Sequence, residues 1–153
     1  MDLILWRHAE AQDPEGDMID LERALTRRGD RQASRMAAWL DRQLPEGTRI
    51  LVSPAVRTEQ TARALGRKYR LHDELRPGAN PDQLLLLAGW PLARAPVLIV
   101  GHQPTLGQTI SRLLGMADAE CSMKKGSVWW LRNREREGQS QVTVVTVQTA
   151  ELL

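Results

Sequence analysis

Short hydrophobic runs in this chain alternate with segments in which apolar residues recur at helical spacing. Residues 2–6 and 97–100 are the clearest apolar runs, and residues 49–52 form a third. Continuous apolar runs of this length are typical of strands that are buried on both faces of a sheet. We therefore predict strands at these three places, and a further short strand at residues 70–75.

Helical periodicity fills the intervals between the predicted strands. An acidic loop at residues 9–24 leads to Thr26, a predicted N-cap, and apolar residues then recur at helical spacing as far as Pro45. Further helices are predicted at residues 55–69, 82–89 and 104–114.

The last part of the chain predicts two strands, at residues 126–132 and 141–148, joined by a charged turn that contains Asn133 and Gly138. Strands and helices alternate before this pair, which favours an α/β fold. We expect a three-layer α/β sandwich. Its central sheet is mostly parallel with an antiparallel edge, and helices cover both faces.

Length and composition narrow the class of protein. The chain has 153 residues, 42% hydrophobic and 26% charged, which fits one soluble globular domain. No stretch approaches the roughly 18 apolar residues of a membrane span. Cys121 is the one cysteine, so an internal disulfide is excluded. Without an export signal we expect a cytoplasmic protein with no membrane partner.

The charge pattern does not indicate nucleic-acid binding. The net charge is +2, and the basic residues are interleaved with 19 acidic ones. A nucleic-acid-binding protein usually carries a basic stripe or tail. We therefore expect no nucleic-acid partner, and we expect the arginines to act locally.

Polar residues follow three of the predicted strands. Arg7-His8 ends the first, residues 53–57 with Arg57 follow the second, and Gly101-His102 ends the strand at 97–100. The carboxyl ends of parallel strands meet at one edge of a sheet, where ligands of such folds bind. The sequence therefore predicts that Arg7, His8, Arg57 and His102 lie together.

Two histidines and two arginines at one edge favour an anion site. Arginine offers a planar fork that matches phosphate oxygens, and a neutral imidazole can attack phosphorus. Each residue taken alone is more often structural or an exposed charge, so the prediction depends on their joint placement. A zinc site of His8, His102 and a carboxylate is the chemical alternative. Arg7 and Arg57 would repel the cation, so we expect no metal and no cofactor.

Four motifs in this order resemble the histidine phosphatase superfamily, which has the phosphoglycerate-mutase-like fold. Residues 5–11 resemble its RHG or RHA signature, although position 9 is Ala where much of the superfamily has Gly. The other matching segments are residues 25–29, 51–62 and 100–104. The RHA variant, the short chain and residues 74–78 look most like the branch of SixA-type phosphohistidine phosphatases.

The resemblance implies a role for each site residue. His8 is implied to be the nucleophile that accepts the phosphoryl group, Arg7 and Arg57 to bind its oxygens, and His102 to be the second histidine that stabilises the transition state. Many members use a carboxylate as general acid, and Glu74 is the candidate here. A surface carboxylate near Arg76 is the alternative interpretation of Glu74.

The implied function is a metal-independent phosphatase that acts through a covalent phosphohistidine intermediate. We expect one domain at residues 1–153 without a cap, because the interval between Arg57 and His102 is short. An open site suits a phosphohistidine on a signalling protein domain, with inorganic phosphate as product. The alternatives are a phosphatase of small phosphomonoesters and a non-catalytic phosphate-binding module.

Overall fold

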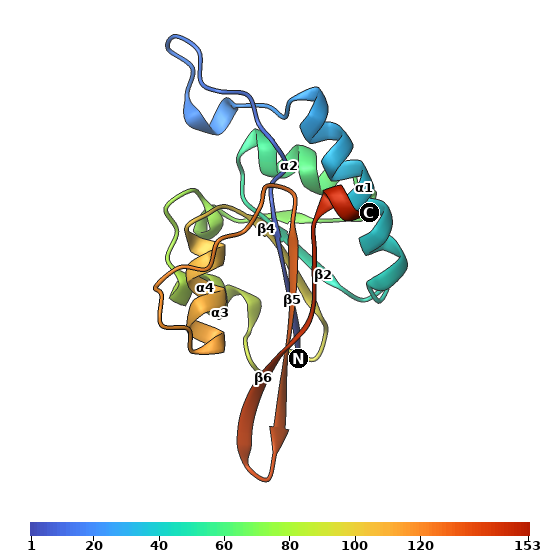
Figure 1. Cartoon of the computed structure of the whole chain (residues 1–153), viewed down its shortest axis with the longest axis vertical. Helices are drawn as coiled ribbons and strands as arrows, with labels where there is room; N and C mark the ends of the chain where they lie inside the picture. Colours follow the sequence, from blue (N-terminus) through green and yellow to red (C-terminus); the bar gives the residue numbers. More distant parts are fainter.

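The central sheet has six strands in the order β3-β2-β4-β1-β5-β6 (Figure 1), in a computed structural model that describes all 153 residues. The first four strands in this order pair in parallel, whereas β5 pairs antiparallel with β1 and β6. This confirms the predicted parallel sheet with an antiparallel edge. The strands are β1 (Asp2–Arg7), β2 (Arg49–Val52), β3 (Arg70–Leu71), β4 (Val97–Gly101), β5 (Val128–Arg136) and β6 (Gln139–Gln148).

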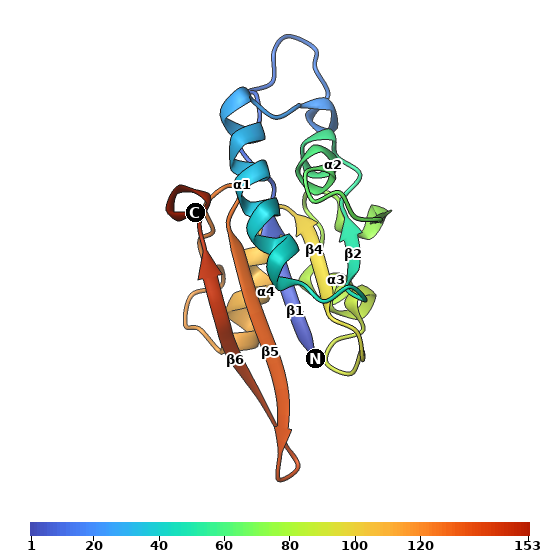
Figure 2. The same ribbon diagram turned by 90° about the vertical axis from the view of Figure 1, so that its right-hand side faces the viewer.

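Helices cover both faces of the sheet, as Figure 2 shows. One face carries α1 (Arg27–Gln43) and α2 (Val56–Arg63), and the other carries α3 (Pro81–Ala88) and α4 (Thr105–Leu114). Three short 3-10 helices complete the fold: η1 (Asp20–Glu22), η2 (Asp73–Leu75) and η3 (Ala150–Leu152). The predicted three-layer α/β sandwich is confirmed. None of the helices combines the length and the apolar character needed to cross a membrane.

Strand β1 separates two hydrophobic cores because its side chains alternate between the faces of the sheet. Ile4 and Trp6 pack with the residues of α1 and α2, whereas Leu3 and Leu5 pack with those of α3 and α4. All four side chains are fully buried. This explains why residues 2–6 form a continuous apolar run rather than an alternating one.

The helix predicted at residues 55–69 is wrong at its carboxyl end. Helix α2 stops at Arg63, and Gly66 adopts a positive φ of 70° that takes the chain out of the helix. Leu65 and Tyr69 still pack against the α1–α2 core. The apolar spacing therefore predicted correctly that both residues pack at the core. A turn brings them there, and not a longer helix.

The strand predicted at residues 70–75 is also shorter than expected. Only Arg70–Leu71 pair with β2, after which the His72 N–H donates to the Val52 carbonyl at 2.9 Å. The chain then turns into η2, because Leu75 buries its side chain in the α3–α4 core.

The last hairpin is longer than predicted, and it projects beyond the rest of the sheet (Figures 1 and 2). Asn133 lies within β5 and not in the turn. The turn is formed by Glu137 and Gly138, which both have positive φ angles, of 52° and 77°. Such a pair is typical of a two-residue hairpin turn. The projecting residues are exposed, so no hydrophobic pattern marked them as strand.

The register of the parallel strands brings three polar segments to one edge. Arg7 at the end of β1 is paired with Gly101 at the end of β4, and Val52 at the end of β2 is paired with Val100. His8, Ser53 and the residue after Gly101 therefore leave the sheet at the same level.

Candidate active site

His8 and His102 face each other at the carboxyl edge of the sheet. Their ring centroids are 5.3 Å apart, and the two residues are only 6% and 3% exposed. The His8 N–H donates to the Gly101 carbonyl at 3.1 Å, which extends the pairing of β1 with β4 beyond the strand ends. The predicted pair of histidines is therefore brought together by the backbone of the sheet.

The orientation of the His8 ring determines which nitrogen can react. Nδ1 lies 2.7 Å from the carbonyl oxygen of Ala9. A carbonyl oxygen only accepts hydrogen bonds, so Nδ1 carries the proton and donates it. The lone pair of the neutral ring is then on Nε2, which is the nitrogen available as a nucleophile.

Burial and positive neighbours keep both imidazoles neutral. Burial is the main cause that lowers the pKa of His8 to about 3, and the charges of Arg57 and Arg7 lower it further, against the hydrogen bond to Ala9. Burial also lowers the pKa of His102 to about 3, together with His8 and Arg57. An imidazole in this state at neutral pH can attack or donate without first losing a proton.

These pKa values predict a specific pH dependence. We expect the ¹⁵N chemical shifts of His8 and His102 to stay those of neutral rings from pH 8 down to pH 5, which NMR can measure. Movement of either ring to the shift of an imidazolium ion within this range would contradict the prediction.

The lowered pKa values of His8 and His102 also predict how the free energy of unfolding changes with pH. The unfolded chain takes up protons on these histidines near pH 6.5, whereas the folded chain takes them up only near pH 3. The unfolded state binds more protons in this window, so the free energy of unfolding falls as the pH falls through it. Urea unfolding at pH 7.5 and pH 5.0 measures this decrease. A His102→Gln variant is expected to lose less stability over the same interval.

Arg57 projects from the first turn of α2 and is 3% exposed. Its Nη1 donates to the backbone carbonyl of Asp20 at 2.8 Å, and its Nη2 contacts the Asp20 carboxylate at 3.0 Å. The same carboxylate accepts from Nε of Arg23 at 2.9 Å. Partial burial alone would raise the pKa of Asp20, but Arg57 and Arg23 lower it. Asp20 is therefore a carboxylate that holds two arginines and not a proton donor.

Arg7 is the last residue of β1, and its Nη1 donates to the carbonyl of Met123 at 2.6 Å. Its backbone N–H donates to the carbonyl of Ser127 at 3.0 Å. The loop before β5 therefore fixes the guanidinium group of Arg7 from one side and leaves its remaining donors free.

Three buried nitrogen atoms at this edge have no hydrogen-bond partner in the chain: Nε of Arg7, Nε of Arg57 and Nδ1 of His102. The other nitrogen of His102, Nε2, lies 2.7 Å from the Ser53 hydroxyl, which can donate its hydrogen. Nδ1 is then an N–H donor. Only four buried side-chain polar atoms of the protein lack a partner. Three of them at one edge indicate that these donors serve an external acceptor.

The residues that carry these donors line a cavity of about 290 Å³, which we call the His8 cavity. It is lined by Arg7, His8, Ala11, Arg23, Arg57, Pro77, His102, Gln103 and Lys125. Four of these side chains are cations and none is a carboxylate. The structure has no group of three or more His, Cys, Asp or Glu side chains that could hold a metal ion. The cavity therefore favours an anion.

Residues 3–79 match the family described as the histidine phosphatase superfamily, branch 1. The chain belongs to the histidine phosphatase superfamily. The phosphohistidine phosphatase SixA of Escherichia coli K12 is 32% identical over 122 residues, which cover 74% of each protein. The family match is thus supported by a sequence relative that is itself a phosphatase.

Comparison with solved structures supports the assignment to this superfamily. A protein of Nakamurella multipartitia assigned to SixA is 30% identical, covers 96% of this chain and 94% of its own, and superposes with a TM-score of 0.77. A protein histidine phosphatase SixA complexed with tungstate is 25% identical, covers 99% of both chains and has a TM-score of 0.78. The SixA-type branch predicted from the motifs is confirmed.

The structure adds three residues to those that the sequence singled out in this histidine phosphatase. Arg23 and its partner Asp20 belong to the acidic loop at residues 9–24, in which the sequence singled out no site residue. Lys125, in the segment before β5, also lines the His8 cavity. The spacing of Asp20 and Arg23, three residues apart, indicates that they can pair with each other but not that they reach the site.

Glu74, the predicted candidate for the general acid, is not brought into the His8 cavity of this histidine phosphatase. Its side chain is 53% exposed and lies 3.8 Å from Nδ1 of His72. The structure thus brings Arg7, His8, Arg57 and His102 together and leaves Glu74 outside.

Proposed function

We propose that this histidine phosphatase removes the phosphoryl group from a phosphohistidine on a partner protein, through a covalent intermediate on His8. The observation that carries the proposal is the set of buried, unpartnered nitrogens of Arg7, Arg57 and His102 around the His8 ring. A phosphoryl group supplies the oxygen acceptors that all three donors require. A non-catalytic binding module would have no need for the oriented lone pair of His8.

In the first step, Nε2 of His8 attacks phosphorus while the phosphorus–nitrogen bond to the substrate imidazole breaks. Arg7, Arg57 and the Nδ1–H of His102 stabilise the three non-bridging oxygens as their charge redistributes. The substrate imidazole leaves as a neutral ring when its other nitrogen carries a proton. Such a leaving group has little need of a carboxylic acid, in contrast to an alkoxide.

In the second step, water attacks the phosphorus of phospho-His8, the bond to Nε2 breaks, and one proton of the water is released. The products are inorganic phosphate and the neutral imidazole of His8. The hydrogen bond from Nδ1 to Ala9 keeps a proton on the ring throughout. The phosphorylated ring is therefore cationic, which makes it a good leaving group.

Two relatives support this choice of substrate. The Escherichia coli protein is a phosphohistidine phosphatase, and a SixA structure is complexed with tungstate, a tetrahedral oxyanion like phosphate. The open cavity of this chain supports it as well. Of residues 76–95, which would have to form a cap, only Pro77 lines the cavity, and Leu84 and Ala88 pack into the core. We propose a single domain without a cap, which suits a phosphohistidine displayed on a protein.

The test is phosphate release from a phosphotransfer domain that carries phosphohistidine, in the presence of a metal chelator. We expect release at the same rate with and without the chelator. Faster turnover of small phosphomonoesters, with none of the phosphodomain, would overturn the proposed substrate in favour of the small-molecule alternative.

Replacing Glu74 by glutamine separates these two substrates further. We expect the Glu74→Gln variant to release phosphate from the phosphodomain within about twofold of the parent rate, because an imidazole leaving group needs little acid catalysis. Asp73→Asn, which changes the exposed neighbouring carboxylate, is the matched control. A loss of tenfold or more with Glu74→Gln alone would assign the general acid to Glu74.

A further inference from the structure

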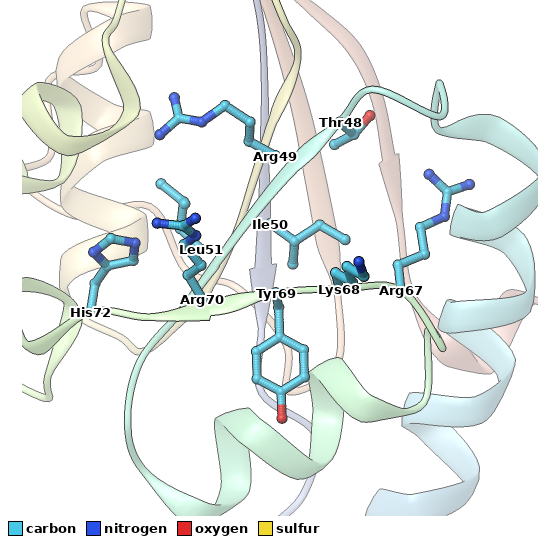
Figure 3. Close-up of a pocket in the computed structure, with 9 residues that line it drawn as sticks. All are labelled: Thr48, Arg49, Ile50, Leu51, Arg67, Lys68, Tyr69, Arg70 and His72. Carbon is cyan, nitrogen blue, oxygen red and sulfur yellow. The ribbon is translucent and has the colours of Figure 1, made fainter.

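A second cationic cavity lies at the β2–β3 edge of the sheet, outside the His8 cavity (Figure 3). We call it the edge groove. It has a volume of about 730 Å³ and is lined by residues 48–51, 67–70 and His72. This size lies within the range of ligand sites in proteins.

The charges of the edge groove are largely unpaired. Arg49, Lys68 and Arg70 are exposed and form no ion pair in the structure. Arg67 is the exception, since its Nε contacts the Asp41 carboxylate at 3.0 Å. No carboxylate lines the groove. The groove therefore has positive charge that the protein itself does not neutralise.

His72 contributes the fourth buried nitrogen that lacks a partner, its Nε2 atom. The other three belong to the His8 cavity, where they indicate an external ligand. Figure 3 shows the guanidinium groups of Arg49 and Arg70 and the ring of His72 on the same side of the β2–β3 edge. The His72 nitrogen is buried beneath this side of the groove, so the accessible, unpaired cations of Arg49 and Arg70 are what favour an acidic ligand.

The backbone at this edge is open to a further strand. Strand β3 pairs only through Arg70 and Leu71, and no strand covers its outer side. Leu71 is 46% exposed at this edge. An exposed sheet edge can bind an extended peptide through main-chain hydrogen bonds, while flanking side chains select its sequence. Such backbone pairing favours a peptide over a nucleic acid.

The edge groove is close enough to the His8 cavity for one partner to cover both. His72 follows β3 directly, so it lies at the carboxyl edge of the sheet, where Ser53 and His102 also lie. Strand β3 is two strand spacings from β4, about 10 Å, and three from β1, about 14 Å. Arg49 begins β2, four residues before Ser53, so it lies roughly 13 Å further from the carboxyl edge along the strand. A protein interface of ordinary size, about 800 Å² on each partner, spans such a separation.

We propose that the edge groove docks an extended acidic segment of the same phosphoprotein whose phosphohistidine enters the His8 cavity. The inference rests on the proposed function, and it adds the charge and the conformation of the partner. The carboxylates of that segment pair with Arg49, Lys68 and Arg70, and its backbone adds to the outer side of β3.

The test compares a protein substrate with a small one in an Arg49→Glu/Arg70→Glu variant. We expect its KM for a phosphohistidine-bearing phosphotransfer domain that also carries an extended acidic segment to rise at least tenfold, with kcat unchanged. For phosphoramidate, which is too small to reach the groove, kcat/KM is expected to stay within twofold. Thermal unfolding of the variant shows that it is folded.

An Arg134→Glu/Arg136→Glu variant is the matched control. It changes the net charge equally, but on the projecting β5–β6 hairpin, and both of its arginines are exposed. An equal rise of KM in both variants would overturn the inference, because it would report only the net charge. An unchanged KM in the groove variant would overturn it as well, while the proposed function would stand.

The parent protein distinguishes a failure of the groove inference from a failure of the proposed phosphatase function. If the proposed function is wrong, the parent protein turns over neither substrate. Binding provides a second measurement. An acidic peptide of aspartate and glutamate residues is expected to shift the amide NMR signals of Leu71 and its neighbours in the parent but not in the groove variant. If a single-stranded oligonucleotide shifts these signals and the peptide does not, the ligand of the groove is a nucleic acid, and the inference is overturned.

Discussion

A His8→Ala variant is expected to lose at least about 10⁴-fold in kcat, because removal of a covalent nucleophile leaves only binding and electrostatic stabilisation. No other side chain presents an oriented lone pair at this place, since the ring of His102 uses Nε2 for Ser53. The measurement is phosphate release from a phosphohistidine domain, together with transfer of labelled phosphoryl group to the protein. An alkaline quench preserves the labelled intermediate, because phosphohistidine is labile in acid.

The variant should still bind phosphate, because Arg7, Arg57 and His102 remain. A His8→Gln variant, which better preserves the volume of the buried ring, is the control for folding, and it should be equally inactive. Labelling of either variant, or phosphate release within tenfold of the parent rate, would show that His8 is not the nucleophile.

An Arg57→Ala variant is expected to lose about 10²- to 10³-fold in kcat/KM, which is typical when one preorganised donor to a developing oxyanion is removed. Arg57 is 3% exposed, so its charge acts where water screens it little. Steady-state kinetics with the phosphodomain or with phosphoramidate measures the loss. Arg57→Lys should recover only part of it, because an ammonium group lacks the planar fork.

Arg63→Ala is the matched control for Arg57. It lies on the same helix, α2, but its side chain is 63% exposed, pairs with Glu59 and does not line the His8 cavity. We expect this variant to keep the parent kcat/KM. Equal activities of the Arg57 and Arg63 variants would contradict the proposed role of Arg57 in binding the phosphoryl oxygens.

The positions of Arg7, His8 and His102 could be predicted because they depend on one rule of parallel sheets. Each follows a strongly apolar strand, and the register of β1 with β4 brings the strand ends to one level. Arg57 followed from the same rule, since the helix after β2 begins next to that strand end. In these cases local sequence and tertiary position are coupled through the backbone.

The contribution of Arg23 could not be predicted, because it depends on how a loop without hydrophobic periodicity closes over the site. Asp20 in that loop contacts Arg57, which is 37 residues away in the chain. No local pattern reports a contact of this kind. The edge groove was missed for a related reason, since residues 48–51 line it together with residues 67–70 and His72, which no local pattern connects.

The contacts that Asp20 and Met123 make with the two arginines have a consequence for the affinity for phosphate. A long side chain such as arginine loses up to about 2 kcal/mol of conformational entropy when it is fixed in one rotamer. Asp20 fixes Arg57 and the Met123 carbonyl fixes Arg7 before any ligand arrives. The entropy of ordering these side chains is therefore lost when the chain folds, and the binding of each phosphoryl group does not have to overcome it again.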